Sequence, residues 1–198
     1  MKIKPPIIDP IIKYPNSLLR QQCAEVTSIT PEVKNFAQQL LIICRLYEGL
    51  GLSAPQVGKS IRIIVVDNKL CPLVKDFGYQ PGDCSPTPVE KEYMRERHPY
   101  LINPVISNIG ESKFKYKEGC LSLPGVNGWV IRPSSFDVTF MALDGKTYTE
   151  HITDTSKDKY GIIVQHEIDH LNGKLFTDMM SGYDLLKLTD KMNKLRRR

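Results

Sequence analysis

The chain has 198 residues, of which 41% are hydrophobic and 25% are charged. This length suits a single domain, expected to span residues 1–198, and the composition excludes broad disorder and a membrane-embedded body. The formal net charge of +5 is too small to indicate nucleic-acid binding by itself, and we expect no specific DNA partner.

Compartment and redox state are indicated by the N-terminus and the cysteines. The segment MKIKPPIIDPIIKYP has no apolar stretch long enough for a signal peptide, and no segment of the chain approaches a membrane span. An odd number of cysteines without a framework spacing favours reduced thiols. These cysteines are Cys23, Cys44, Cys71, Cys84 and Cys120. We therefore expect a cytoplasmic protein with no membrane partner, in which a thiolate is free to bind metal.

The first predicted element is a helix over about residues 31–48, ending at Gly49. Thr30 can cap it, Pro31 suits its first position, and apolar residues recur at helical spacing. Cys44 falls on the apolar face, so we interpret it as core packing. The glycine-broken segment GLGLSAPQVGKS follows, and the branched apolar run IRIIVVD (61–67) predicts a buried strand.

Residues 68–100 lack periodicity and carry five prolines, and we interpret them as a long excursion. Strands are then predicted in SKFKYKEG, FDVTFMAL and TYTEHIT (147–153), with Asp144–Gly145 as a hairpin turn. The stretch YGIIVQHEIDHLNG ends at Asn172–Gly173, and an amphipathic helix, DLLKLTDKMNKL, follows. Because strands and helices are segregated, we predict a small α+β domain.

The last eight residues, KMNKLRRR, concentrate the basic excess. Cations suit a helix C-terminus, so a solvated helix end is one interpretation. A docking surface for an anionic partner is the other.

The segment IVQHEIDHLNG (163–173) contains an HExxH pattern. On a helix His166 and His170 share one face and can chelate one ion together. Glu167 lies beside that face, where a general base for water activation is needed. The flanking residues are apolar, and buried imidazole and carboxyl groups are costly unless something satisfies them. A metal site is therefore favoured over a surface helix.

A third ligand is not found where metalloproteases have it. Phe176 stands in place of the third histidine of HExxHxxGxxH, and no glutamate follows Glu167. The upstream candidates are His98, Cys120 and His151. We favour Cys120, because the tight segment EGCLSLPG pre-organises its thiolate, whereas solvent exposure explains His151. Three protein ligands would leave a coordination position open, which is typical of a catalytic site.

Three stretches, GLGLSAPQVG (49–58), EGCLSLPG (118–125) and QHEIDHLNG (165–173), resemble the signature motifs of peptide deformylases, in the same order. The resemblance implies a metal-dependent hydrolase that removes the N-terminal formyl group from formyl-methionyl peptides of new proteins and releases formate. It implies antiparallel strands around a central HExxH helix, with further helices near both termini. The partners are then nascent formyl-methionyl polypeptides.

Carried over by position, the resemblance implies a role for each motif residue. One divalent ion is bound by Cys120, His166 and His170. Glu167 activates water, while the Gln56 side-chain amide and the Leu121 backbone N–H hold the oxyanion. Substrate contacts fall to Gly49, Leu50, Gly51, Ile162 and Ile163. Arg132 is expected to pair with Glu118 behind the metal ligands.

The ligand set fits zinc or iron. The family resemblance implies Fe2+ physiologically, with Zn2+, Ni2+ or Co2+ in preparations. The C-terminal helix is similar to the bacterial branch in which such a helix can dock on the ribosome. Three features depart from the family: Ser53 replaces an alanine, VNGWVIRP lacks the usual aromatic or arginine near position 127, and the 68–100 insertion is longer than in compact members.

Two alternatives remain. A metal-dependent peptidase would share HExxH, and an inactive ribosome-binding relative would share the fold. The absence of a downstream ligand argues against the first. The second is opposed by the presence of all five residues with an implied role in catalysis or metal binding, which are Gln56, Cys120, His166, Glu167 and His170.

Overall fold

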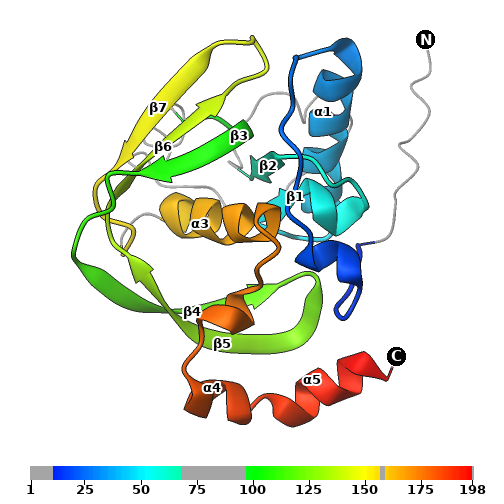
Figure 1. The fold of residues 1–198 in the computed structure, drawn as a ribbon, viewed down its shortest axis with the longest axis vertical. Helices are drawn as coiled ribbons and strands as arrows, with labels where there is room; N and C mark the ends of the chain where they lie inside the picture. Colours follow the sequence, from blue (N-terminus) through cyan, green and yellow to red (C-terminus); the bar gives the residue numbers. More distant parts are fainter. Residues whose placement is uncertain (1–10, 68–96, 157–158, 198) are drawn as a thin grey trace, which may run out of the picture.

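The computed structural model describes residues 11–67, 97–156 and 159–197. Two antiparallel β-sheets enclose a helix, α3 (Lys159–Leu171), as Figure 1 shows. This arrangement confirms the predicted α+β class with the HExxH segment on a central helix. The N-terminal residues 1–10 and most of the predicted excursion, residues 68–96 with Cys71 and Cys84, lie outside the described residues.

The larger sheet has five strands in the order β1-β2-β3-β6-β7, with every neighbouring pair antiparallel. Its strands are β1 (Gly51–Ser53), β2 (Ile63–Val66), β3 (Tyr100–Ser107), β6 (Phe136–Met141) and β7 (Thr147–Ile152). The smaller sheet is a hairpin of β4 (Lys113–Cys120) and β5 (Leu123–Pro133). The four strands predicted from alternation or apolar runs are thereby confirmed as β2, β4, β6 and β7.

Strands β3 and β5 were not predicted, because a proline interrupts β3 and glycines and prolines interrupt β5. In β3, Asn103 adopts a left-handed φ of 51° and the pairing register with β6 shifts between Ile102 and Val105. Because of this irregularity, Pro104 has no pairing partner in β6. The position suits proline, which has no backbone N–H to donate to the neighbouring strand. The Asn103 side chain pairs with the backbone of Val26 at 2.8 and 2.9 Å, so the bulge is fixed by a tertiary contact.

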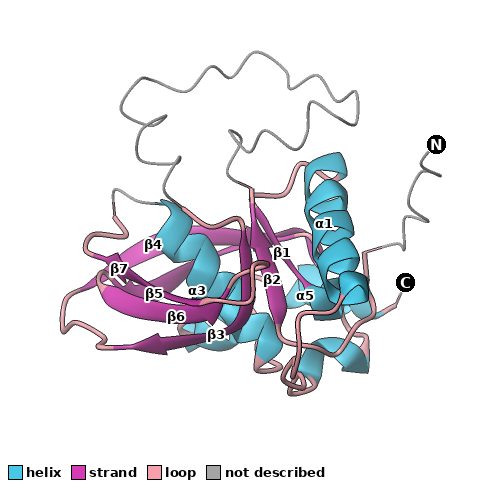
Figure 2. Ribbon diagram, turned by 90° about the horizontal axis from the view of Figure 1, so that it is seen from above, coloured by secondary structure: helices cyan, strands magenta, loops and turns pink. Residues whose placement is uncertain are grey.

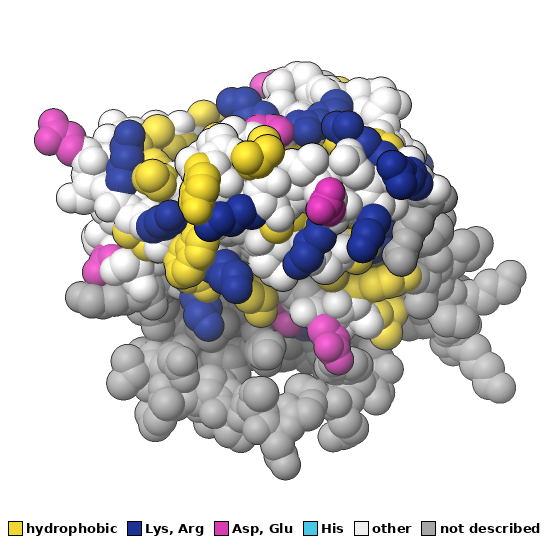
Figure 3. Space-filling model, turned by 90° about the horizontal axis from the view of Figure 1, so that it is seen from below, with side chains coloured by type: hydrophobic (Ala, Val, Ile, Leu, Met, Phe, Trp, Pro, Cys, Tyr) yellow, Lys and Arg dark blue, Asp and Glu magenta, His cyan; other side chains and the backbone are white. Residues whose placement is uncertain are grey.

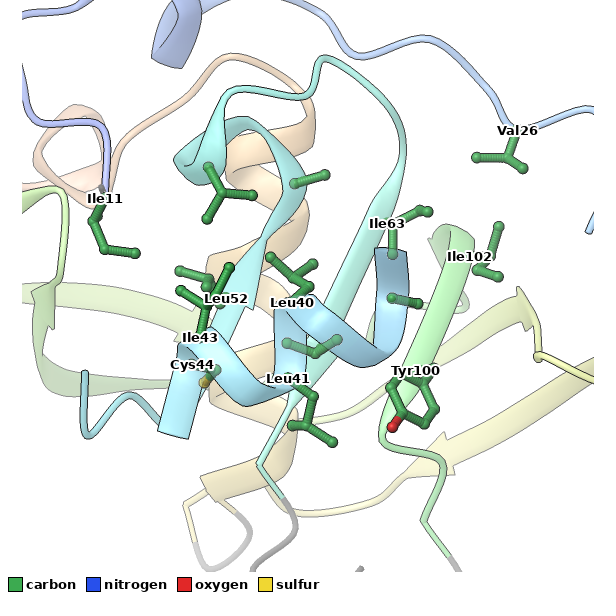
Figure 4. Packing of buried hydrophobic residues seen from close by; sticks show 14 residues of the cluster. Ile11, Val26, Leu40, Leu41, Ile43, Cys44, Leu52, Ile63, Tyr100 and Ile102 are labelled. Atoms are coloured by element: carbon green, nitrogen blue, oxygen red, sulfur yellow. The ribbon is translucent and has the colours of Figure 1, made fainter. Parts of the chain in front are cut away.

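Helix α1 (Pro31–Leu46) starts as predicted, with the Thr30 hydroxyl accepting a hydrogen bond from the Val33 N–H at 3.3 Å. Figure 4 shows its apolar side chains directed at the larger sheet. Cys44 is fully buried there, which confirms its role in packing. Cys23, Cys44 and Cys120 are all free thiols.

Helices α1 and α3 cover opposite faces of the larger sheet, and β2 lies between them (Figure 2). Successive strand residues point to opposite faces. Ile63 and Val65 accordingly join the core beneath α1, while Ile64 and Val66 join the core beneath α3. Burial on both faces explains why β2 reads as an unbroken apolar run.

Helix α3 ends where the sequence predicted. Gly173 follows with a φ of +68°, and its N–H donates to the His170 carbonyl at 3.1 Å. A Cβ at this position would lie 2.5 Å from the carbonyl oxygen of Arg20. Glycine is therefore required here by both backbone conformation and space.

The single helix predicted over DLLKLTDKMNKL is wrong. The structure has two short helices, α4 (Gly182–Leu186) and α5 (Thr189–Arg196). Leu188, which lies between the two helices, packs with Met192 and Leu195 in one buried cluster that includes Val126 and Val130 of β5, while Leu186 stays 71% exposed. No helix in the described part of the chain is long and apolar enough to cross a membrane.

Candidate metal centre

The structure brings the three predicted metal ligands together. His166 and His170 lie one turn apart on α3, and Cys120 ends β4 after a register shift at Gly119. Their ligand atoms all lie within 4.8 Å of one another, and the Cys120 Sγ is 3.2 Å from the His170 Nε2. Both imidazoles are buried and Cys120 is half-buried.

The two alternative third ligands lie elsewhere. His151 is exposed on β7, with its Nδ1 2.7 Å from Asp137. The His98 ring packs against Phe140 and Tyr148, with ring centroids 5.2 and 4.3 Å away. Among the described residues, Cys120 alone supplies the third ligand atom of a cluster with His166 and His170.

The chemistry of this donor set fits a divalent transition metal. Two imidazole nitrogens and one thiolate are ligands that suit zinc or iron, and three protein ligands leave room for reactants. Burial opposes ionisation of the Cys120 thiol, but the imidazoles of His170 and His166 outweigh it and hold its pKa well below the usual range. The thiol is thereby favoured in the thiolate form that binds metal.

Behind the ligands lies a buried network centred on Glu118 and Arg132. Arg132 donates from Nε and Nη2 to both Glu118 oxygens, at 2.7 and 2.9 Å, and its Nη1 reaches Asp169 on α3. The second Glu118 oxygen also lies 2.7 Å from the His166 Nδ1. Burial opposes ionisation of Glu118, yet these hydrogen bonds lower its pKa to about 2. An ionised Glu118 orients the His166 ring so that Nε2 faces Cys120.

Glu167 projects from α3 into the same buried space. Its carboxylate is almost fully buried, and its Oε2 has no hydrogen-bond partner among the described residues. Burial raises the pKa of Glu167, against the opposing effect of the His166 and His170 imidazoles. A carboxyl group in this environment can exchange a proton closer to neutral pH than an exposed one.

The predicted oxyanion donors flank the cluster from two other elements. Gln56 lies in a 3-10 turn, η2 (Ala54–Val57), and its Nε2 is 3.5 Å from the Cys120 Sγ. Leu121 follows Cys120 directly, and its carbonyl accepts a hydrogen bond from the Lys13 Nζ at 2.6 Å. The two predicted donors therefore lie near the same thiol, because Leu121 is the residue after Cys120 and the Gln56 amide contacts the Cys120 Sγ.

Two of the predicted substrate contacts, Gly51 and Ile163, lie close to each other beside Glu167. A Cβ on Gly51 would lie 2.4 Å from the Ile163 Cγ2 and 2.9 Å from the Glu167 Oε1. Glycine at this position is thus required by the close approach of β1 to α3, a reason that the sequence did not reveal. Leu50 is 48% exposed, whereas Ile162, one turn before His166, is buried. Gly49 packs on Leu121.

Three polar residues of the site were not predicted as such. Ser122 is fully buried and accepts a hydrogen bond from Gln56, Asp169 pairs with Arg132, and Ser53 contacts Gln56. All three lie inside the recognised motifs. A polar residue between apolar neighbours in such a motif is a usable signal, because its burial would require a partner.

Two histidines on one helical turn, a converging thiol and a buried glutamate define the class of metal-dependent hydrolases with an HExxH helix. Comparison with known proteins narrows this class. The family model for polypeptide deformylase matches residues 8–185. The chain belongs to the peptide deformylase family, whose members are metal-dependent hydrolases that remove the formyl group from the N-terminal methionine of nascent peptides.

Individual relatives support the assignment. A peptide deformylase of Hydrogenovibrio crunogenus is 35% identical over 185 residues, covering 93% of this chain and 92% of the relative. One of Borreliella burgdorferi is 33% identical over 170 residues, covering 85% of each. The solved structure of a Plasmodium falciparum peptide deformylase in complex with an inhibitor superposes with a TM-score of 0.75 at 34% identity, covering 95% of this chain and 99% of that one.

Breaking the buried Glu118–Arg132 pair should be strongly destabilising. Replacing Arg132 by Met leaves the buried Glu118 and the half-buried Asp169 carboxylates without this partner, and we expect the free energy of unfolding to fall by about 3–5 kcal/mol. The matched control is Arg20→Met, whose pair with Asp178 is 41% and 36% exposed and should be worth less than about 1 kcal/mol. Urea unfolding measures both. Equal losses in the two variants would contradict the assignment of a buried network.

Proposed function

We propose that this chain is an active peptide deformylase in which Cys120, His166 and His170 bind one catalytic divalent ion. The observation that carries the proposal is the convergence of their three ligand atoms within 4.8 Å, beside the buried carboxylate of Glu167. Fe2+ is the proposed physiological ion, with Zn2+, Ni2+ or Co2+ as substitutes. When bound, the ion supplies a Lewis acid that acidifies water and polarises the formyl carbonyl.

Glu167 is proposed to act as the general base and then as the general acid. Its carboxylate takes the proton of the attacking water and later gives it to the departing amine. The raised pKa of this buried carboxyl supports the second step, because a protonated Glu167 persists closer to neutral pH. The space beside its Oε2, which has no partner among the described residues, is where the water is proposed to lie.

Gln56 and Leu121 are proposed to stabilise the oxyanion that forms as the formyl carbon becomes tetrahedral. The Gln56 Nε2 and the Leu121 N–H are donors on two segments that meet at Cys120. A pre-organised donor of this kind typically stabilises the transition state by about 3–4 kcal/mol. Both are part of the folded scaffold, so neither must reorganise during the reaction.

The substrate is proposed to bind along β1. This strand ends the five-stranded sheet, so its outer edge is available to an extended peptide that adds as a further strand. Gly49, Leu50 and Gly51 supply that edge, and the partly exposed Leu50 can cover the methionine side chain. The half-buried Ile163 and the buried Ile162 on α3 are proposed to line the methionine pocket.

Deformylation is tested with formyl-Met-Ala-Ser and protein loaded anaerobically with Fe2+ or Ni2+. We expect release of formate and intact Met-Ala-Ser, and a loss in kcat of about 10²–10⁴-fold in Glu167→Gln, the size of general acid–base catalysis. Glu111→Gln, the same change at an exposed position, should leave the rate unaltered. Cleavage of internal peptide bonds would establish a peptidase, and no turnover of either kind would establish an inactive relative.

The ligand assignment is tested by metal content. We expect His170→Ala to lose bound metal, while His151→Ala, which removes an exposed histidine, should retain one ion per chain. In Co2+-loaded protein, Cys120→Ser should remove the thiolate-to-metal charge-transfer absorption. Atomic emission and visible spectra measure these outcomes. Retention of metal and absorption by all the variants would refute the proposed ligand set.

A ribosome contact is proposed for the face that carries α4, α5 and the β4–β5 hairpin. Figure 3 views this face and shows more Lys and Arg than Asp and Glu side chains, with hydrophobic side chains among them. Lys113, Lys115 and Lys117 are exposed at alternate positions of β4, opposite the exposed Trp129 and Ile131 of β5. Further exposed cations on the C-terminal segment are Lys187, Lys191, Lys194, Arg196 and Arg197. A polyanion such as ribosomal RNA complements this surface.

Charge reversal should weaken this contact without affecting catalysis. In the double variant Lys191→Glu/Lys194→Glu, we expect weaker co-sedimentation with ribosomes. The slope of the logarithm of the ribosome-binding constant against the logarithm of the salt concentration should become shallower by about 0.9 for each lost phosphate contact. Lys34→Glu/Lys146→Glu, exposed on α1 and at the β6–β7 turn, is the matched control. Equal effects of the two pairs would refute a localised docking face. Turnover of formyl-Met-Ala-Ser should be unchanged in both.

The setting of this activity is proposed from the sequence. Residues 1–198 are proposed to form one catalytic domain acting in the cytoplasm, where nascent formyl-methionyl chains emerge. The family match over residues 8–185 supports a single catalytic unit.

A further inference from the structure

The side-chain amide of Gln56 is held by hydrogen bonds at both ends. A primary amide offers two acceptor positions on its oxygen and two N–H donors on its nitrogen. Gln56 is only 1% exposed, so the protein must satisfy these positions. The residues that do so determine which part of the amide is left for a substrate.

Both acceptor positions are occupied by Ser53. The Gln56 Oε1 accepts from the Ser53 backbone N–H at 2.9 Å and from the Ser53 Oγ at 2.7 Å. The backbone N–H can only donate, so rotating the amide by 180° would place two donors against each other. The orientation of the amide, with its nitrogen toward the metal centre, is therefore set by the fold.

One of the two donor positions is occupied by Ser122. The Gln56 Nε2 donates to the Ser122 Oγ at 3.2 Å, and Ser122 is fully buried. The nitrogen also lies 3.5 Å from the Cys120 Sγ, a weak acceptor. Three of the four positions thus have firm oxygen or nitrogen partners. The remaining N–H is directed toward the metal centre, where the Cys120 Sγ is its acceptor at 3.5 Å.

The two serines come from different motifs, and one N-terminal segment bonds to the backbones of Gln56 and Ser122. Ser53 ends β1 three residues before Gln56, while Ser122 lies 66 residues further along the chain than Gln56. The backbone N–H of Ile12 donates to the Gln56 carbonyl at 2.8 Å, and that of Tyr14 donates to the Ser122 carbonyl at 2.9 Å. The segment that contains Ile12 and Tyr14 therefore bridges the backbones of Gln56 and Ser122.

We propose that Ser53 and Ser122 are positioning residues that hold the Gln56 amide so that one N–H faces the developing oxyanion. This inference rests on the proposed function of Gln56. A donor held in place before the reaction stabilises the transition state without reorganising, so loosening it lowers kcat more than it raises KM. It also gives a chemical role to the serine that replaces alanine at position 53.

A double-mutant cycle tests the inference on the metal-loaded enzyme with formyl-Met-Ala-Ser. We expect Gln56→Ala to lower kcat by about 10²–10³-fold. Ser122→Ala should lower kcat by about five- to tenfold, the effect of one hydrogen bond, with KM unchanged. In the Gln56→Ala background, Ser122→Ala should have no further effect, because the group through which it acts is gone.

The outcomes separate this inference from the proposed function. A further five- to tenfold loss from Ser122→Ala in the Gln56→Ala background would overturn the positioning role alone. Full activity of Gln56→Ala would overturn the oxyanion role of Gln56 and the positioning role with it. Thr155→Val, which removes a buried hydroxyl bonded to the Pro133 carbonyl, is the matched control and should leave kcat unchanged.

Ser53→Ala provides a second cycle should Ser122→Ala fail to fold. Its backbone N–H still holds the Gln56 oxygen, so the expected loss in kcat is only about two- to threefold. Because the Ser53 side chain also bonds Glu167, this loss should become smaller, not vanish, in the Gln56→Ala background. Metal content and urea unfolding of every variant show whether a change in kcat is accompanied by loss of the ion or of the fold. A loss that is undiminished without Gln56 overturns the inference for Ser53.

Discussion

Helix α3 carries two imidazoles and a carboxylate into the space between two β-sheets, where such groups are costly unless each has a partner. Much of the surrounding structure supplies those partners. Glu118 comes from β4, Arg132 from β5, and Asp169 from α3 itself, and together they link the hairpin to the helix. The same network that stabilises the buried charges sets the direction of the His166 ring. Stability and metal-site geometry therefore depend on one set of contacts.

The larger sheet imposes a second constraint on the geometry of the site. Its strand β2 is buried on both faces by α1 and α3, and the terminal strand β1 lies against α3 because Gly51 has no side chain. This close approach brings the free edge of β1, the 3-10 turn with Gln56, and Glu167 to the same side of the helix. The proposed substrate peptide, added as a strand at that edge, would lie next to this carboxylate.

Local signals were sufficient for several elements and misleading for others. Helix α1, strands β2, β4, β6 and β7, and the end of α3 at Gly173 were predictable because periodicity, caps and turn residues act within a few residues. Strands β3 and β5 were missed because Pro104 and the glycines of β5 oppose strand structure locally. The C-terminal helix was predicted as continuous because its amphipathic spacing is unbroken, whereas the structure interrupts it between Leu186 and Thr189.

The sequence by itself determined the chemistry: an HExxH pair, a thiol in a tight segment, and a glutamine in a glycine-rich turn, each with a fixed local geometry. It also determined the family through the order of three motifs. Only the tertiary structure decided that Cys120 rather than His151 or His98 meets the two histidines, and that Ser53 and Ser122 hold opposite ends of the Gln56 amide. The Ser53–Gln56 pair is local, but Cys120 and His170 are separated by 50 positions in the sequence, and Gln56 and Ser122 by 66. The partner of a buried polar group is chosen by packing, which local periodicity does not encode.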